Sequence, residues 1–243
     1  MKVTCPDKSE KEIDECLNCE NPCYPKFILK LLLDGRKKKK KKRDRQRFGV
    51  TRLVGGCLRK TYYDLTEEVS RTLEKMWIFN RGTAIHEFVQ KDMPEEDVEL
   101  FLTKEFGHFD VLAFVDAIHE GVLYEFKTTA NIPQEPQEHH TLQAQAYYSI
   151  LPPEKQEKIK KLVLMYFSLH KIKQFEVPKR DITHYLEARG TMLANALTTG
   201  TEPKREEGWL CDYCEFKDIC YGHKLTTYIP EKKEEDSQTK LDT

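Results

Sequence analysis

The sequence predicts a mixed α/β fold in which a central mixed sheet is flanked by helices. Two β-rich runs at 109–118 and 122–127 flank the short turn 119–121, a pattern that predicts an antiparallel pair of strands. A helical segment follows at 137–151, and further strands and a last helix come after it. This order of helix, strands, helix, strands and helix indicates a single mixed core.

Local patterns justify the early helices. The short apolar run at 27–33 is typical of a helix. A second helix is predicted over 83–91, because Ile85, Phe88 and Val89 form an i, i+3, i+4 apolar stripe. Both helices lie before the predicted strand pair.

Proline and glycine set the ends of the later elements. Pro152 ends the helix at 137–151. A last helix begins after Asp181, which is a suitable capping residue, and ends at Gly200. Two strands are predicted between these helices, at 162–169 and 173–177.

Length and composition indicate one main domain. The chain has 243 residues, of which 39% are hydrophobic, enough for one sizeable core and a small appendage. It lacks the run of about 18 apolar residues that a membrane span needs, and its first residues lack the apolar segment of a secretory signal. We therefore expect a soluble, cytoplasmic protein with no membrane partner.

Positive charge is concentrated in one segment. Residues 36–47 hold ten basic residues and one acid, whereas the rest of the chain carries 30 basic and 40 acidic residues. Such a segment is typical of a flexible arm that contacts nucleic-acid phosphates. The alternative is a solvated loop without a partner.

The eight cysteines fall into two groups. In a reducing compartment, C-x-x-C spacings point to metal or redox chemistry rather than to disulfides. One group is an isolated cysteine and a C-terminal C-x2-C-x5-C array, and it suits an iron-sulfur cluster or a structural zinc: Cys57, Cys211, Cys214 and Cys220. The other is compact, and its alternatives are zinc or free thiols: Cys5, Cys16, Cys19 and Cys23.

An acidic motif suggests a catalytic metal ion. Glu125 and Lys127 project from the same face of a strand, about 6.6 Å apart along the chain. Asp110, in the run Gly-His-Phe-Asp, stands at the start of the preceding strand, where a hairpin would bring it beside Glu125. Two carboxylates suit magnesium or manganese, which can bind a phosphate oxygen and activate water. Asp116 shares the strand face of Asp110 and is the alternative, although the Gly-x-x-Asp setting favours Asp110.

Two further segments supply polar candidates. His86 lies beside the apolar stripe of its helix, where a histidine is more often structural than a ligand. Gln143 and Tyr147 share a helix face at i and i+4 and could bind a phosphate or order Lys127. Gln145 with Tyr148 is an alternative pair.

Taken in order, these segments resemble the motifs of the RecB-type branch of the PD-(D/E)xK nuclease superfamily. The resemblance rests on Gly-Thr-Ala-Ile-His86, Gly-His-Phe-Asp110, Tyr-Glu125-Phe-Lys127 and Gln143-Ala-Gln-Ala-Tyr147. With Cys57 and the C-terminal cysteine array, the chain resembles the Cas-four family, the iron-sulfur exonucleases associated with CRISPR adaptation. The resemblance covers about residues 48–222.

The resemblance implies roles for single residues. A manganese or magnesium ion would be held by His86, Asp110, Glu125 and the carbonyl of Phe126, while Lys127 would serve the attacking water and Gln143 with Tyr147 would complete the site. A 4Fe-4S cluster on Cys57, Cys211, Cys214 and Cys220 would join the N- and C-terminal parts of the domain. The implied activity is metal-dependent cleavage of single-stranded DNA, often as a 5′ to 3′ exonuclease and sometimes with endonuclease activity. It trims DNA fragments before the CRISPR integrase inserts them as spacers.

Two non-enzymatic alternatives compete with this prediction. One is a metal-clasped protein that only binds DNA or a CRISPR partner, but both carboxylates and the lysine are present, and unused buried charges are costly. The other is a zinc-containing regulator, for which the sequence shows neither a helix-turn-helix nor a finger with histidine ligands. The predicted division is a cysteine-rich leader with a candidate zinc site (1–35), a basic arm (36–47), the nuclease domain (48–228) and a disordered tail (229–243).

Overall fold

A computed structural model of the chain describes residues 2–33 and 45–222. Most of the predicted basic arm and the whole predicted tail at 229–243 lie outside these residues. The described part contains no helix that is both long and apolar enough to span a membrane.

The described residues form helices and strands that are interspersed along the chain. The helices are α1 (Ile13–Leu17), α2 (Lys26–Leu33), α3 (Val50–Val54), α4 (Leu58–Thr66), α5 (Leu73–Gln90), α6 (Glu138–Ile150), α7 (Pro153–Gln156), α8 (Thr183–Thr199) and α9 (Lys217–Tyr221), with 3-10 turns η1 (Glu95–Asp97) and η2 (Trp209–Tyr213). The strands are β1 (Lys2–Thr4), β2 (Glu10–Glu12), β3 (Gln46–Gly49), β4 (Ser70–Thr72), β5 (Val98–Phe106), β6 (Phe109–His119), β7 (Val122–Thr128), β8 (Lys161–Phe167) and β9 (Ile172–Val177).

The main sheet is mixed, as predicted. Its strands follow the order β3-β6-β7-β8-β9, and β5 pairs with β6 outside this path. β3 runs parallel to β6 and β7 runs parallel to β8, whereas the pairs β5-β6, β6-β7 and β8-β9 are antiparallel. The predicted hairpin is confirmed as β6 and β7, and the predicted helices at 137–151 and after Asp181 are α6 and α8.

β6 changes its neighbour along its length, which creates a fork in the sheet. On one side it pairs with β3 from Phe109 to Leu112 and with β7 only from Ala117 to His119. Between these two stretches neither strand supplies a ladder partner on that side. Asp116 lies at the fork, immediately before β6 and β7 begin to pair.

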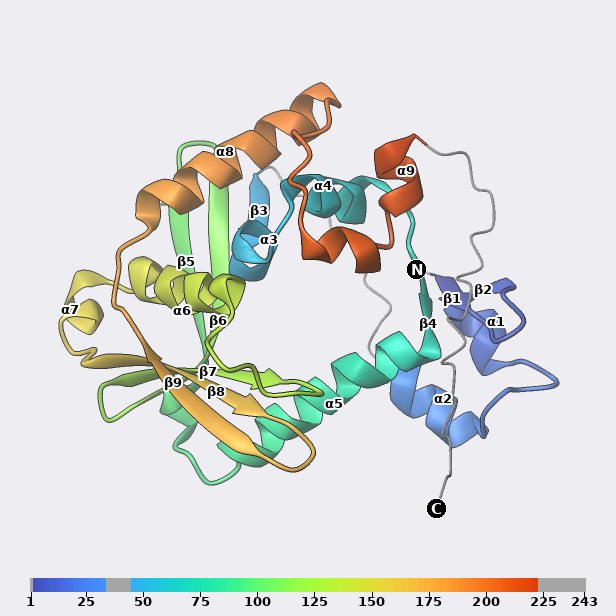
Figure 1. Cartoon of the computed structure of the whole chain (residues 1–243), viewed down its shortest axis with the longest axis horizontal. Coiled ribbons are helices and arrows are strands. Elements are labelled where there is room, and N and C mark those ends of the chain that lie inside the picture. The colour runs from blue at the N-terminus through green and yellow to red at the C-terminus, as the bar shows by residue number, and fades with distance from the viewer. Residues whose placement is uncertain (1, 34–44, 223–243) are drawn as a thin grey trace, which may run out of the picture.

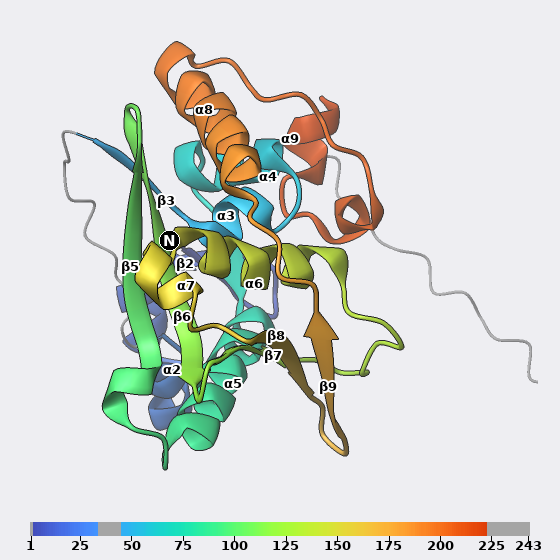
Figure 2. The ribbon, with the colours of Figure 1, turned by 90° about the vertical axis from the view of Figure 1, so that its left-hand side faces the viewer.

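Helices cover the sheet and close the main core. α3, α6 and α8 pack against the sheet on one side, while α5 contacts β7 from the other (Figures 1 and 2). Fully buried side chains such as Val111, Leu123, Leu164 and Leu193 fill the space between sheet and helices. Glu125 and Lys127 of β7, and Gln143 and Tyr147 of α6, lie beside this core, which holds their side chains in fixed positions.

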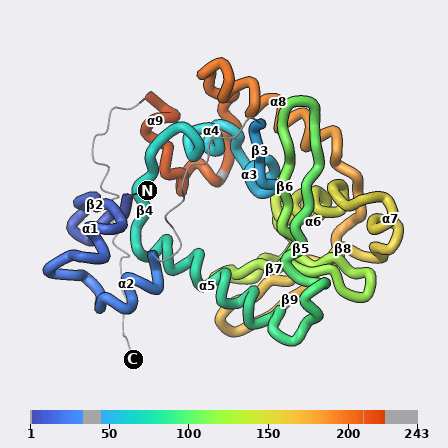
Figure 3. Tube along the Cα trace, turned by 180° about the vertical axis from the view of Figure 1, so that it is seen from behind, coloured from blue at the N-terminus to red at the C-terminus, as the bar shows by residue number. Residues whose placement is uncertain are grey.

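The N-terminal residues form a separate small lobe. β1 pairs antiparallel with β2 and parallel with β4, and α1 and α2 pack beside this three-stranded sheet. The lobe has its own small core: Val3, Ile13, Cys16, Leu29, Leu32, Leu33, Leu73 and Met76. Figure 3 shows α5 running from this lobe to the main sheet.

A close approach of α8 to β6 yields a stability prediction. A Cβ atom at Gly190 would stand 2.2 Å from the ring of Phe109, which is fully buried. We expect Gly190→Ala to lower the free energy of unfolding by about 1–3 kcal/mol, because the overpacked ring must move. The matched control is Gly82→Ala in α5, where the nearest atom is 3.6 Å away. That helical substitution is expected to be neutral or stabilising by up to about 1 kcal/mol. Urea unfolding curves measure both, and equal midpoints would contradict the prediction.

Candidate metal centre and cysteine pockets

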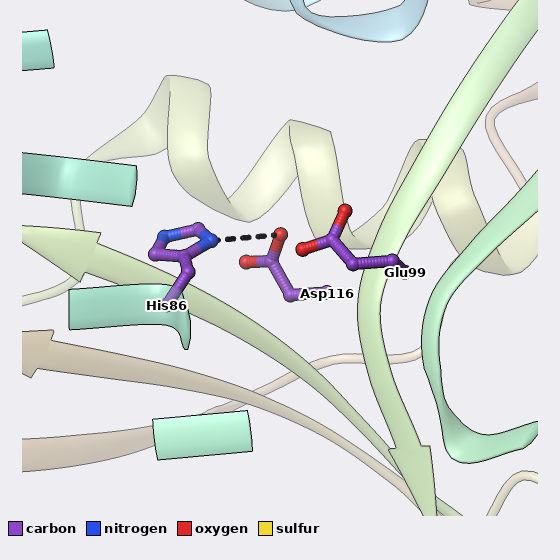
Figure 4. A group of neighbouring side chains, drawn as sticks. All are labelled: His86, Glu99 and Asp116. Atoms are coloured by element: carbon purple, nitrogen blue, oxygen red, sulfur yellow. Dashed lines mark ion pairs between the residues drawn. The ribbon is translucent and has the colours of Figure 1, made fainter. Parts of the chain in front are cut away.

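Three side chains that suit a metal ion meet at the fork of the sheet. His86 comes from α5, Glu99 from β5 and Asp116 from β6, and their ligand atoms all lie within 4.8 Å of one another (Figure 4). Nδ1 of His86 stands 3.5 Å from Oδ1 of Asp116. Among the described residues, this is the one group of three or more such side chains that comes so close.

The peptide of Phe126 completes this group. Its N–H donates to Oδ2 of Asp116 at 2.6 Å, and its carbonyl accepts from Nε2 of His86 at 3.1 Å. The predicted set of His86 and the Phe126 carbonyl is therefore brought together, with Asp116 beside them. A ring-edge contact between His86 and Phe126 further fixes the imidazole.

Glu125 and Lys127 begin a polar chain that leads into α6. The Lys127 ammonium lies 2.5 Å from Oε1 of Glu125 and donates to Oε1 of Gln143 at 2.9 Å. The Gln143 amide in turn donates to the hydroxyl of Tyr147 at 2.7 Å. The structure thus brings these four sequence-predicted residues together. The alternative Gln145 points elsewhere, because its amide donates to the carbonyl of Pro178.

The second oxygen of Glu125 has no protein partner. Glu125 is 1% exposed, and its Oε2 atom is buried without a hydrogen-bond donor. A buried, unpaired carboxylate oxygen costs free energy unless a donor or cation satisfies it. The donor set of carboxylates, a backbone carbonyl and one imidazole therefore fits a divalent ion such as magnesium or manganese.

Burial shifts the acidity of this centre. Burial raises the pKa of Asp116 to about 7, although the N–H of Phe126 opposes the shift. Burial likewise raises the pKa of Glu125 to about 8, against the nearby Lys127 ammonium. Both carboxyls therefore hold protons near neutral pH more readily than exposed acids do.

The raised pKa values give a pH prediction. A bound ion must displace protons from these carboxyls, so its affinity falls as the pH drops below their pKa values. Each proton displaced weakens binding about tenfold per pH unit below the pKa. We expect the manganese affinity, measured by titration calorimetry, to be at least about tenfold weaker at pH 6 than at pH 8. The manganese affinity of Glu125→Gln should depend less steeply on pH, because one of the two titrating carboxyls is absent. Equal manganese affinities of the wild type at pH 6 and pH 8 would contradict binding of the ion at these carboxyls.

Asp110 lies apart from this centre. Its carboxylate forms ion pairs with Arg45 and with Arg47, the latter at 3.1 Å. Asp110 precedes Asp116 by six positions in β6, about 20 Å along an extended strand. The structure therefore does not bring the predicted metal ligand Asp110 together with Glu125, and Asp116 occupies the place expected for it.

Glu99 was not predicted from the sequence. It stands in β5 opposite Asp116, between the pairs Val98–Ala117 and Leu100–Val115, with a left-handed φ of 48°. Gln90 of α5 donates to its carboxylate at 3.0 Å. Non-glycine residues in this conformation cluster at functional sites. No strand was predicted at 98–106, although Val98, Leu100 and Leu102 recur at every second position there. That alternation would indicate a strand, but it would not single out an acid within it.

The cysteines of the predicted cluster line one pocket. Cys57 immediately precedes α4, Cys211 lies in η2, Cys214 follows η2, and Cys220 lies in α9. All four face the same cavity together with the rings of Tyr63 and Phe216. The structure thus gathers four thiols from both ends of the domain.

The N-terminal cysteines also line a common pocket. Cys5, Cys16, Cys19 and Cys23 surround it within the small lobe. The ammonium of Lys11 donates to the sulfur of Cys19 at 3.3 Å. Both cysteine groups predicted from the sequence are therefore grouped in space.

A further pocket connects the polar chain with the C-terminal cysteine pocket. It is lined by Lys127 and Gln143 on the polar chain, by Cys57, and by His139 and His140 of α6. Burial lowers the pKa of His140 to about 2 and also lowers that of His139. Both imidazoles are therefore neutral at pH 7, and the lining also includes Arg52 and Lys60.

A comparison with known protein families shows to which family the chain belongs. Residues 37–221 match the sequence profile of the PD-(D/E)XK nuclease superfamily. The chain belongs to this superfamily. Nucleases of this superfamily use divalent metal ions, which agrees with the group formed by His86, Glu99 and Asp116. The Glu-x-Lys spacing that forms part of the superfamily's name occurs in β7 at Glu125 and Lys127.

The fold of the chain is also similar to that of solved structures. The crystal structure of SSO0001 is 21% identical and covers 82% of this chain and 96% of its own, with a TM-score of 0.60. A candidate exonuclease from Eubacterium rectale is 15% identical and covers 86% of this chain and 84% of its own, but its TM-score of 0.39 is too low to support an inference. No curated protein sequence matches the chain.

Proposed function

We propose that this PD-(D/E)XK protein is a manganese- or magnesium-dependent deoxyribonuclease that degrades single-stranded DNA from its 5′ end. The observation that carries the proposal is the convergence of His86, Asp116 and the Phe126 carbonyl beside Glu125, whose free oxygen lacks a donor. In this proposal Asp116, rather than Asp110, is the aspartate that binds the ion.

Each residue has a distinct task in the proposed reaction. His86, Asp116, Glu125 and the Phe126 carbonyl would hold the ion, which when bound supplies an activated water and neutralises charge on the phosphate. Lys127, held between Glu125 and Gln143, orients the attacking water and stabilises the negative charge that develops at phosphorus. Tyr147 keeps the Gln143 amide in the rotamer that accepts from Lys127.

Glu99 supports the metal ligands from the far side. Its carboxylate lies within 4.8 Å of the ligand atoms of His86 and Asp116, and Gln90 orients it. Gln90 also donates to the carbonyl of Asp116 at 2.8 Å, so one side chain positions both acids. We assign Glu99 an outer role at the ion, such as holding a coordinated water.

The second part of the proposal is a 4Fe-4S cluster on Cys57, Cys211, Cys214 and Cys220. Four thiols around one pocket form a suitable ligand set, and Tyr63, Leu210 and Phe216 provide an apolar lining. The cluster would fix the C-terminal segment to the start of α4 and serve as a structural clasp.

The pocket between the two centres supports single-stranded DNA as substrate. Lys127, Arg52 and Lys60 bring cations to its lining, each paired with a carboxylate, and His139 and His140 supply neutral imidazoles. Unpaired bases can stack on rings while cations track the phosphates. The order of motifs and cysteines supports a role in trimming DNA for the CRISPR integrase.

The test uses protein purified without oxygen. Single-stranded DNA labelled at its 5′ or 3′ end is incubated with manganese, magnesium or EDTA. We expect manganese-dependent release of short products from the 5′ end and no cleavage in EDTA. Binding of DNA without any cleavage under these conditions would favour the non-catalytic alternative and overturn the proposal. Digestion from the 3′ end would overturn the polarity alone.

A further inference from the structure

We infer that Cys5, Cys16, Cys19 and Cys23 bind one zinc ion, and that this zinc site fixes the start of α5 and so positions His86. The positioning part rests on the proposed nuclease function.

The four thiols come from successive parts of the small lobe. Cys5 lies in the turn between β1 and β2, where its N–H donates to the carbonyl of Ser9 at 2.8 Å and Lys8 adopts a φ of 69°. Cys16 is buried on α1, Cys19 follows one turn later, and Cys23 precedes α2. The spacings Cys16-x2-Cys19 and Cys19-x3-Cys23 lie within the range of structural zinc sites.

A neighbouring ammonium favours the thiolate form of one of the four cysteines. The ammonium of Lys11 donates to Cys19 at 3.3 Å and offsets part of the negative charge that four thiolates would bring. No three of these sulfur atoms lie within 4.8 Å of one another in the described structure, although all four line one pocket. Binding of zinc would therefore draw the turn at Cys5, the end of α1 and the loop at Cys23 together.

The lobe needs such a link for its stability. Its core consists of eight buried residues, and Cys16 is one of them. A core of this size supplies little free energy of folding, and small units of this kind depend on metals or disulfides. Thiolate ligation by zinc contributes directly to folding.

The lobe also carries the first turn of α5. β1, which leads into Cys5, pairs in parallel with β4, and the last residue of β4, Thr72, caps α5 by accepting from the N–H of Lys75 at 3.2 Å. Leu73 and Met76 of α5 belong to the core of the lobe. The side chain of Asn80 donates to the carbonyl of Leu31 in α2 at 2.8 Å.

Beyond these contacts, α5 reaches the metal centre along β7 without a fully buried side chain between Met76 and Gln90. Leu73, Met76 and Gln90 are its buried residues, and none of the positions from 77 to 89 is buried. The position of His86 therefore depends on the lobe at the start of the helix and on the contacts near its end, where His86 meets Phe126 and Gln90 meets Glu99. Loss of the zinc site would loosen the start of α5. Loss of the contacts that support a metal-ligating histidine typically lowers metal affinity about tenfold or more.

The first experiment counts metals and measures the helix. Zinc and iron per chain are determined for the wild type, for a Cys16→Ser, Cys19→Ser double variant and for Cys57→Ser. The double variant should lose its zinc and keep its iron, whereas Cys57→Ser should lose iron and keep zinc. In the double variant, hydrogen exchange of α5 amides should accelerate, and the manganese affinity should fall about tenfold.

A second measurement covers the case in which the double variant does not fold. Zinc is extracted from the wild-type protein with a chelator, and manganese binding is measured before and after zinc is restored. Iron in place of zinc at these cysteines, or four freely reactive thiols in the native protein, would overturn the zinc site. Unchanged exchange and unchanged manganese affinity after zinc loss would overturn the positioning role. An inactive protein with normal zinc and manganese binding would instead contradict the nuclease function alone.

Discussion

Asp116→Asn is expected to lower the rate of DNA cleavage at saturating manganese by about a thousandfold. The substitution removes one of the charges that would hold the ion next to His86 and leaves the N–H of Phe126 with a weaker acceptor. Loss of one preorganised charge in a buried catalytic site typically costs a hundredfold to a thousandfold, and loss of the ion adds to this. Single-turnover cleavage of labelled single-stranded DNA measures the effect.

Asp110→Asn provides the matched comparison, because it makes the same chemical change on the same strand. Asp110 is buried and pairs with both Arg45 and Arg47, so its replacement is expected to lower stability by about 1–3 kcal/mol. Cleavage per folded molecule should stay within about tenfold of the wild type. If Asp110→Asn proved the more damaging of the two for manganese binding, the assignment of Asp116 would fail.

Cys214→Ser is expected to remove the iron and sulfide from the protein and to lower its melting temperature by about 10 °C. Cys214 lines the pocket that joins the C-terminal segment to the start of α4, so without the cluster this segment has only side-chain contacts to hold it. Metal ligation that joins distant segments contributes several kcal/mol, and each kcal/mol shifts the melting temperature by about 2–4 °C at this chain length. Iron analysis and differential scanning calorimetry measure the two effects.

Cys23→Ser is the control for the loss of the cluster. Cys23 is exposed and lies in the N-terminal pocket, so its replacement should leave iron content unchanged. Retention of iron and of the wild-type melting temperature in Cys214→Ser would contradict the proposed cluster. Replacement of the iron signal by zinc in the wild type would support a structural zinc knot instead.

Much of the fold was predictable because local patterns decide it. The turn between β6 and β7, the prolines after α6 and the capping residue before α8 are short-range signals, and the elements they delimit were predicted within two residues at most ends. α5 was predicted only in its second half, although it begins at Leu73. Its first turns face a small separate core, so their apolar pattern is weak. The three-stranded sheet of the lobe has strands of three residues, too short to show a period.

Most residues of the candidate site could be predicted from the sequence, but the choice of Asp116 over Asp110 could not. Parity along β6 gives Asp110 and Asp116 the same face, so periodicity alone does not separate them. What separates them is the fork, where β6 leaves β3 and begins to pair with β7. That change depends on contacts between segments far apart in sequence, as does the approach of Glu99 from β5. His86 was assigned through the family resemblance, since its helix alone gives no sign of a ligand.

β6, β7 and α6 follow one another in the chain, whereas the C-terminal cysteine pocket joins positions 57 and 211. Contacts between near neighbours in sequence form faster than contacts that close long loops. We therefore expect the acidic centre to assemble early during folding and the thiol pocket to assemble late. An iron donor would then meet a domain that is already largely folded, and newly made protein deprived of iron would accumulate as a compact molecule with a loose C-terminal end.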